Sequence, residues 1–134
     1  MEARGIHHLG VAVDDLDRAV TTYERVFGAR LEHRETVPDQ GVEAASLRVG
    51  EGRVELLASL GEDTPVGKFL AKRGPGMHHV AYEVADVGEA IDELAGKGIE
   101  LVDERPRQGL FGLEVAFLHP HALDGVLAEL VAHG

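Results

Sequence analysis

An internal repeat is the feature that most limits how this chain can fold. The sequence GIHHLGVAV at residues 5–13 returns as GMHHVAYEV at residues 76–84. A second shared piece closes each copy, because VELL around Glu55 resembles AELV around Glu129. Each half of the chain therefore begins with a histidine-bearing segment and ends with a glutamate-bearing one. This pattern predicts two copies of one supersecondary unit.

Within each copy, the hydrophobic pattern predicts the order strand, helix, strand, strand, strand. In the first copy, residues 6–13 have the character of a strand, and residues 15–27 repeat apolar side chains at helical spacing before Gly28. Three further strands are expected near 29–35, 42–49 and 53–58. The second copy predicts a strand at 77–84, a helix at 86–96 and strands near 99–103, 111–118 and 125–131. A short helix is expected around 66–73, between the two copies.

Both copies fit into one domain of the α+β class. The length of 134 residues is that of one ordinary domain. We expect a first βαβββ unit at about 5–60, a connector at about 61–75 and a second βαβββ unit at about 76–132. The connector is rich in turn residues, but nothing in it indicates a linker between separate domains.

Composition excludes several classes of partner. The formal net charge of −11 would repel a phosphate backbone, so nucleic acid is not an expected partner. Because the chain has no cysteine, a metal site would have to be built from histidine and carboxylate. The sequence contains no apolar run of membrane-spanning length and opens without an apolar signal region. These features predict a soluble cytoplasmic protein without a membrane partner.

Each histidine pair lies in a predicted strand, where successive side chains face opposite ways. Only one histidine of each pair can therefore point into a given cavity. His8 shares its face of the strand with Gly10 and Ala12, whose small size leaves room there. The repeat makes His79 the counterpart of His8.

Two glutamates interrupt apolar strands, Glu55 in the first copy and Glu129 in the second. Burying a polar group without compensation costs roughly 2–7 kcal/mol, and an ion costs more, so a divalent cation is the simplest compensation. Together with His8 and His79, these glutamates predict a metal site that suits Co²⁺, Ni²⁺, Mn²⁺ or Zn²⁺. The alternative is that the glutamates lie on solvent faces of edge strands and the histidines are ordinary core or surface residues.

The remaining histidines carry weaker patterns. His119 and His121 follow a predicted strand in the sequence FLHPH, which is equally compatible with a surface turn and with a role in the site. His33 and His133 occur in no special pattern.

Five motifs carry a family resemblance over nearly the whole chain. The most specific are PDQGV at 38–42 and DTPVGKFLAK at 63–72. GMHHVA at 76–81, FLHP at 117–120 and GVLAEL at 125–130 accompany them. Together they resemble the vicinal oxygen chelate superfamily, and within it the methylmalonyl-CoA epimerase family. The resemblance implies that the two βαβββ units form one curved mixed sheet around a metal cleft.

The resemblance also implies a ligand set and a reaction. Metal ligation falls on His8, Glu55, His79 and Glu129, with Co²⁺ the expected ion and Ni²⁺, Mn²⁺ or Zn²⁺ the alternatives. The implied reaction interconverts (2R)- and (2S)-methylmalonyl-CoA through a metal-stabilised enolate, with Glu129 and Glu55 as the proton-transfer residues. The implied partners are an acyl-CoA substrate and a second copy of the chain. Candidates for contacts with the coenzyme A phosphates are Lys68, Lys72, Arg73, Arg105 and Arg107.

One position departs from the family pattern. Some epimerases carry a catalytic glutamate four residues after the glutamine of the QGV piece, and here that position is Ala44. The neighbouring Glu43 is expected to face the other way. If Glu55 and Glu129 serve only as ligands, Glu43 and His119 are the next candidates for the base.

Three other functions use similar residues. Glyoxalase I uses the same ligand set for related enediolate chemistry on a glutathione hemithioacetal. A metal-free binding protein of the drug-sequestering kind is the non-enzymatic alternative. An extradiol dioxygenase needs iron and usually two histidines with one carboxylate, so the second glutamate argues against it.

Overall fold

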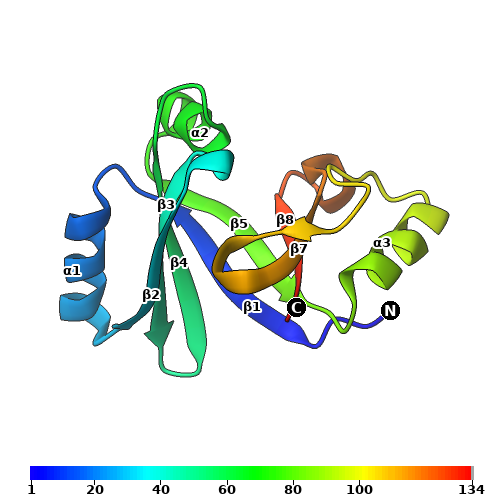
Figure 1. The fold of residues 1–134 in the computed structure, drawn as a ribbon, viewed down its shortest axis with the longest axis horizontal. Coiled ribbons are helices and arrows are strands. Elements are labelled where there is room, and N and C mark those ends of the chain that lie inside the picture. Colours follow the sequence, from blue (N-terminus) through cyan, green and yellow to red (C-terminus); the bar gives the residue numbers. More distant parts are fainter. Residues whose placement is uncertain (134) are drawn as a thin grey trace. The chain divides into compact units, whose positions relative to one another are not determined.

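The computed structural model describes residues 1–133 and repeats the order strand, helix, strand, strand, strand (Figure 1). The α+β class and the two βαβββ units are therefore confirmed. The strands and α-helices are β1 (Gly5–Ala12), α1 (Leu16–Phe27), β2 (Arg30–Val37), β3 (Val42–Val49), β4 (Gly52–Ser59), α2 (Pro65–Arg73), β5 (Gly76–Glu83), α3 (Val87–Gly96), β6 (Arg107–Gln108), β7 (Leu113–Leu118) and β8 (Ala128–His133). Short 3₁₀ turns are η1 (Pro38–Gln40), η2 (Leu110–Gly112) and η3 (Pro120–Leu123). Over residues 1–133, no helix has the length and apolar composition that crossing a bilayer requires.

The contacts divide the chain into two compact units. The N-terminal unit is His8–His78, and the C-terminal unit combines Met1–His7 with His79–Gly134. Each unit contains four strands and its own helix-covered core, which are described separately below.

In the N-terminal unit the strands are ordered β2-β3-β4-β1, with β1 parallel to β4 and the other pairs antiparallel. Helix α1 packs on one face of this sheet. It begins where the Asp15 carboxylate accepts the Arg18 N–H at 3.0 Å and ends at Gly28, whose φ of 66° suits glycine. The apolar core on this face consists of Val13, Leu16, Val20, Ala29, Ala45, Leu47 and Leu56.

The C-terminal unit has the same plan, with strands in the order β5-β8-β7-β6. Helix α3 packs against β7 and β8, and it begins where the Asp86 carboxylate accepts the Glu89 N–H at 2.9 Å. The core with α3 consists of Val84, Val87, Ala90, Ile91, Ala116, Leu118, Ala128, Leu130 and Ala132. A separate buried cluster contains Ala81, Leu113, Val115 and Val131.

The prediction of a strand near 99–103 is wrong. Within residues 1–133, that segment forms one isolated bridge, from Leu101 to Leu118. The strand that pairs with β7 on the side away from β8 is β6 at Arg107–Gln108. The Asp103 carboxylate accepts the Phe117 N–H at 2.8 Å, where a regular ladder would use a backbone carbonyl. A side chain thus competes with the ladder, and the segment runs beside β7 without becoming a strand.

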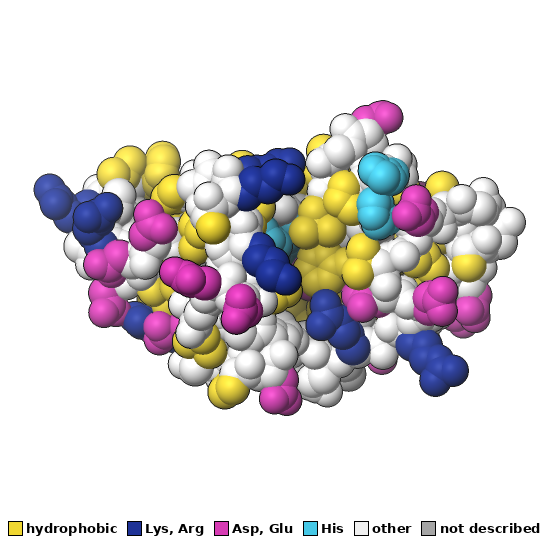
Figure 2. Space-filling model, turned by 90° about the horizontal axis from the view of Figure 1, so that it is seen from above, with side chains coloured by type: hydrophobic (Ala, Val, Ile, Leu, Met, Phe, Trp, Pro, Cys, Tyr) yellow, Lys and Arg dark blue, Asp and Glu magenta, His cyan; other side chains and the backbone are white. Residues whose placement is uncertain are grey.

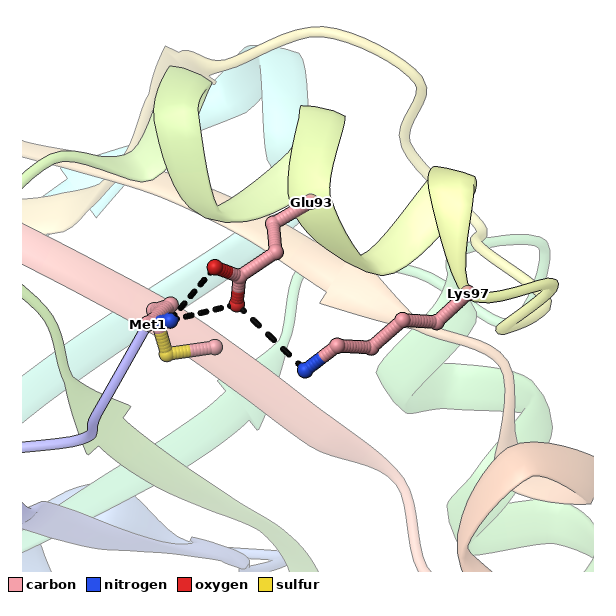
Figure 3. A network of polar contacts seen from close by, with 3 residues as sticks. All are labelled: Met1, Glu93 and Lys97. Carbon is pink, nitrogen blue, oxygen red and sulfur yellow. Dashed lines mark hydrogen bonds and ion pairs between the residues drawn. The ribbon is translucent and has the colours of Figure 1, made fainter.

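Helix α3 also holds the start of the chain within the C-terminal unit (Figure 3). The α-ammonium group of Met1 lies 2.5 and 2.6 Å from the two carboxylate oxygens of Glu93, and Lys97 Nζ lies 3.5 Å from one of them. The hydrogen bond from Met1 is the main reason that the pKa of Glu93 lies below its usual value, and the charges of Met1 and Lys97 act in the same direction.

The DTPVGK segment packs closely against the end of β4. The Thr64 hydroxyl accepts the Gly67 N–H at 3.0 Å, donates to the Gly61 carbonyl at 2.8 Å and lies 2.7 Å from the Ser59 hydroxyl. A Cβ atom added at Gly67 would overlap the Gly61 carbonyl oxygen and lie 2.8 Å from Ser59 Oγ. The close approach of two backbone segments therefore requires glycine at this position of α2.

A Gly67→Ala variant is expected to lower the free energy of unfolding by about 1–3 kcal/mol, the usual cost of overpacking. Gly96→Ala is the matched control, because no atom lies within 4 Å of a Cβ added at that end of α3. Alanine also favours helix over glycine, so the control should be neutral or slightly stabilising. Urea denaturation of both variants measures the difference, and equal midpoints would contradict the close packing at Gly67.

Candidate functional site

In the N-terminal unit, a buried imidazole faces a buried carboxylate. His8 on β1 is 4% exposed and Glu55 on β4 is 5% exposed, and His8 Nε2 lies 3.4 Å from Glu55 Oε2. The parallel register pairs Gly10 with Glu55, so His8, two residues before Gly10, lies on the same face of the sheet as the carboxylate. This face is opposite to the one that packs on α1.

The C-terminal unit contains an equivalent pair. His79 on β5 is 4% exposed and Glu129 on β8 is 8% exposed, with His79 Nε2 3.3 Å from Glu129 Oε1. Here the parallel register pairs Ala81, two residues after His79, with Glu129. The two units therefore place one histidine and one glutamate at the same relative positions in their sheets.

The first histidine of each pair has different surroundings. His7 is half-buried, and its ring lies 5.9 Å from that of His133. His78 is half-buried, and its ring meets Phe69 edge-on at 4.9 Å. The alternation along β1 and β5 thus separates the four histidines into two that are buried beside a glutamate and two that are not.

The donor types of the two pairs fit a divalent metal ion. Each unit offers one imidazole nitrogen and one carboxylate oxygen in a buried environment, where a carboxylate is stable only if something compensates its charge. Borderline divalent ions accept this mixture of nitrogen and oxygen ligands. The His8–Glu55 pair of the N-terminal unit and the His79–Glu129 pair of the C-terminal unit both consist of such ligands.

Ala44, the position where some family members carry a catalytic glutamate, lies on β3 and on the same face of the sheet as the Glu55 carboxylate of β4. Ser46 is the Cα partner of Glu55, and Ala44, two residues earlier, is completely buried. Glu43 faces the other way, as expected, and its carboxylate lies 3.1 Å from Arg34 Nη2.

The ion pairs of Arg34 hold Glu43 on the face of the sheet that packs on α1, opposite to the face of Glu55. Arg34 also lies 2.7 Å from Asp17, and the hydrogen bond to Asp17, followed by that to Glu43, raises the pKa of the guanidinium. Glu43 is therefore directed away from the face that carries Glu55 and is not positioned for proton abstraction there.

Phe117 lies beside His79, and Arg107 lies over the Phe117 ring, an arrangement that the sequence does not indicate. Phe117 meets the His79 ring edge-on at 5.6 Å, and its Cα partner is Glu129. The Arg107 guanidinium lies 5.6 Å from the centre of the Phe117 ring and 3.3 Å from Asp103. The parity of β7 would have placed Phe117, but the two-residue strand that carries Arg107 has no hydrophobic pattern to reveal it.

Three of the other basic candidates lie on one helix. Lys68, Lys72 and Arg73 lie on α2, and the Arg73 guanidinium lies 5.8 Å from the centre of the Phe69 ring. Figure 2 shows basic side chains in dark blue interspersed with acidic side chains in magenta on the visible face. Since His119 precedes η3 on a surface loop, it is not part of either buried pair.

The chain is similar to known proteins in both sequence and structure. The sequence profile of the Glyoxalase/Bleomycin resistance protein/Dioxygenase superfamily matches residues 7–117. The mitochondrial methylmalonyl-CoA epimerase of Bos taurus is 39% identical over 126 residues, which cover 93% of this chain and 72% of that protein. A crystal structure of methylmalonyl-CoA epimerase from Mycobacterium tuberculosis has a TM-score of 0.94 at 38% identity, over 98% of this chain and 89% of that one. A methylmalonyl-CoA epimerase in complex with methylmalonyl-CoA and NH4+ has a TM-score of 0.95 at 37% identity, over 99% and 96% of the two chains.

Proposed function

Because this chain belongs to the methylmalonyl-CoA epimerase family of the glyoxalase/bleomycin resistance protein/dioxygenase superfamily, we propose that it interconverts (2R)- and (2S)-methylmalonyl-CoA. The observation that carries the proposal is the pair of equivalent buried histidine–glutamate contacts, one in each unit. The similarity to a structure that contains methylmalonyl-CoA supports the choice of substrate.

The reaction needs two proton-transfer groups. The α-carbon between a thioester and a carboxylate carries a weakly acidic proton, which must leave from one face and return to the other. One group on each face of the carbon performs this most directly. Glu55 and Glu129 are the proposed pair, because each is a buried carboxylate at the equivalent position of its unit.

A divalent ion is the proposed cofactor, held by His8, Glu55, His79 and Glu129. When bound, it supplies a Lewis acid and a template for the thioester oxygen and the free carboxylate of the substrate. Co²⁺ is the proposed ion, and Ni²⁺, Mn²⁺ and Zn²⁺ are compatible with the same ligands. His8 and His79 orient the two glutamates, since their Nε2 atoms face the carboxylate oxygens.

The remaining parts of the proposal concern binding and assembly. Arg107, beside the Phe117 ring, and the basic residues of α2 would offset the acidity of the chain toward an anionic coenzyme A ester. We propose that residues 1–134 act as one domain, that two copies associate, and that the protein works in the cytoplasm.

Turnover in deuterated water tests the reaction directly. After reconstitution with divalent metal, the protein is expected to exchange the α-proton of methylmalonyl-CoA with solvent and to interconvert its epimers, both visible by NMR. The matched assay supplies methylglyoxal and glutathione. No epimerisation by metal-loaded protein, together with rapid formation of lactoylglutathione, would reassign the site to glyoxalase I.

Succinyl-CoA is expected to exchange its α-protons much more slowly than methylmalonyl-CoA. Its carboxylate lies one carbon farther from the thioester, so the two groups cannot form the same chelate. The initial rates of deuterium uptake under identical conditions measure the difference. Equal rates would contradict binding through both oxygens while leaving metal binding intact.

A further inference from the structure

Three potential metal ligands meet on the surface of the C-terminal unit. His119 Nε2 lies 3.7 Å from one carboxylate oxygen of Glu100, and His121 Nδ1 lies 3.8 Å from the other. One ligand atom from each of the three residues lies within 4.8 Å of the others. Figure 2 shows histidine side chains in cyan at the surface beside an acidic side chain in magenta.

The backbone fixes this arrangement. The His119 N–H donates to the Glu100 carbonyl at 3.0 Å, and this hydrogen bond holds the loop after β7 beside the segment that follows α3. His119 then caps η3, where its Nδ1 accepts the His121 N–H at 3.1 Å, and Pro120 at the first position restricts the turn. The two imidazole rings are consequently close, with centroids 4.4 Å apart.

We infer that Glu100, His119 and His121 form a second metal site, which binds Ni²⁺, Cu²⁺ or Zn²⁺ at the surface. Two imidazoles and one carboxylate suit these borderline ions, and water would complete the coordination. Ligand atoms at about 2.1 Å from one ion lie about 3–4 Å apart, so small side-chain rotations suffice. Such rotations are available because the side chains of Glu100 and His121 are 57% and 80% exposed.

Metal binding at this site has a structural consequence. In a neutral imidazole only one ring nitrogen has a free lone pair, and in His119 the Nδ1 lone pair already accepts the His121 N–H. Ligation through Nε2 would move the proton to Nδ1 and remove that acceptor. The ion therefore competes with the cap of η3, and the backbone amide of His121 should report its binding.

Retention on immobilised Ni²⁺ tests this site without relying on activity. The parent chain is expected to be retained and then eluted by imidazole, because neighbouring surface histidines bind the immobilised ion. His8 and His79 are buried and are not expected to contribute. His121→Ala should abolish retention and Glu100→Gln should weaken it. His133→Ala is the control, because the exposed His133 and the half-buried His7 form the rival pair of neighbouring histidines.

Zn²⁺ titration of the same proteins gives the second measurement. Loss of His121 should weaken Zn²⁺ at this site by more than the roughly 10–100-fold typical of an outer-shell change, and the His121 amide of the parent should shift in NMR spectra. Unchanged thermal unfolding of the metal-free variants shows that they remain folded. Lack of retention of the parent, or equal loss with His133→Ala, would overturn the inference.

Discussion

A His79→Ala variant is expected to lose most of the divalent metal that the parent chain binds, whereas His78→Ala should keep it. The His79 imidazole is buried and 3.3 Å from Glu129, while His78 packs against Phe69. Metal content after reconstitution and dialysis measures the effect, with about one tightly held ion per chain expected for the parent. A His121→Ala background keeps surface-bound metal from contributing.

The other unit supplies an independent pair of variants. His8→Ala should lose metal and His7→Ala should keep it, because only His8 faces a buried carboxylate, Glu55. Addition of metal to stripped parent protein should also raise its melting temperature, since an ion that binds only the folded state stabilises it. If the His7 and His78 variants lose metal and the His8 and His79 variants keep it, the ligands lie on the faces of β1 and β5 opposite to those proposed.

Strand alternation explains why much of the arrangement could be predicted. A period of two leaves one histidine of each pair on the face with Gly10 or Ala81, and the structure buries those two, His8 and His79. The repeat then sets the spacing of the glutamates, because both units pair a glutamate with the residue two after the histidine. Neither inference needed knowledge of long-range contacts.

The features that could not be predicted depend on single side chains. Residues 99–103 have the apolar character of a strand, but Asp103 takes a ladder position by accepting the Phe117 N–H. Arg107 lies in a strand of two residues, too short for any periodicity, so its position over Phe117 could not be read from the pattern. Such choices are made by competing hydrogen bonds rather than by hydrophobic pattern.

The Ala44 departure is partly offset by the neighbouring strand. Glu35 on β2 is the Cα partner of Ala44 on β3, so both lie on the same face of the sheet. Glu43 cannot supply this carboxylate, because it faces the other way and pairs with Arg34. The face that carries Glu55 thus retains an acidic side chain one strand away from the family position.

Glu129→Gln and Glu55→Gln are each expected to slow epimerisation by about 10²–10⁴-fold, the usual contribution of a general acid or base. Glutamine keeps an oxygen ligand of similar shape but cannot accept a proton, so metal should largely remain. If each glutamate serves one face of the α-carbon, each variant should still exchange deuterium into one epimer without inverting it. NMR of both epimers in deuterated water, with metal content measured in parallel, tests this.

The stereochemistry of the residual exchange decides the roles. Exchange that outlasts epimerisation and depends on the starting epimer would assign Glu129 to one face and Glu55 to the other. Parental rates in both metal-loaded variants would leave these glutamates as ligands only. Proton transfer would then have to come from another group on the same sheet faces, and Glu35, opposite Ala44, would be the first to replace by glutamine, because Glu43 is paired with Arg34 and His119 lies on a surface loop.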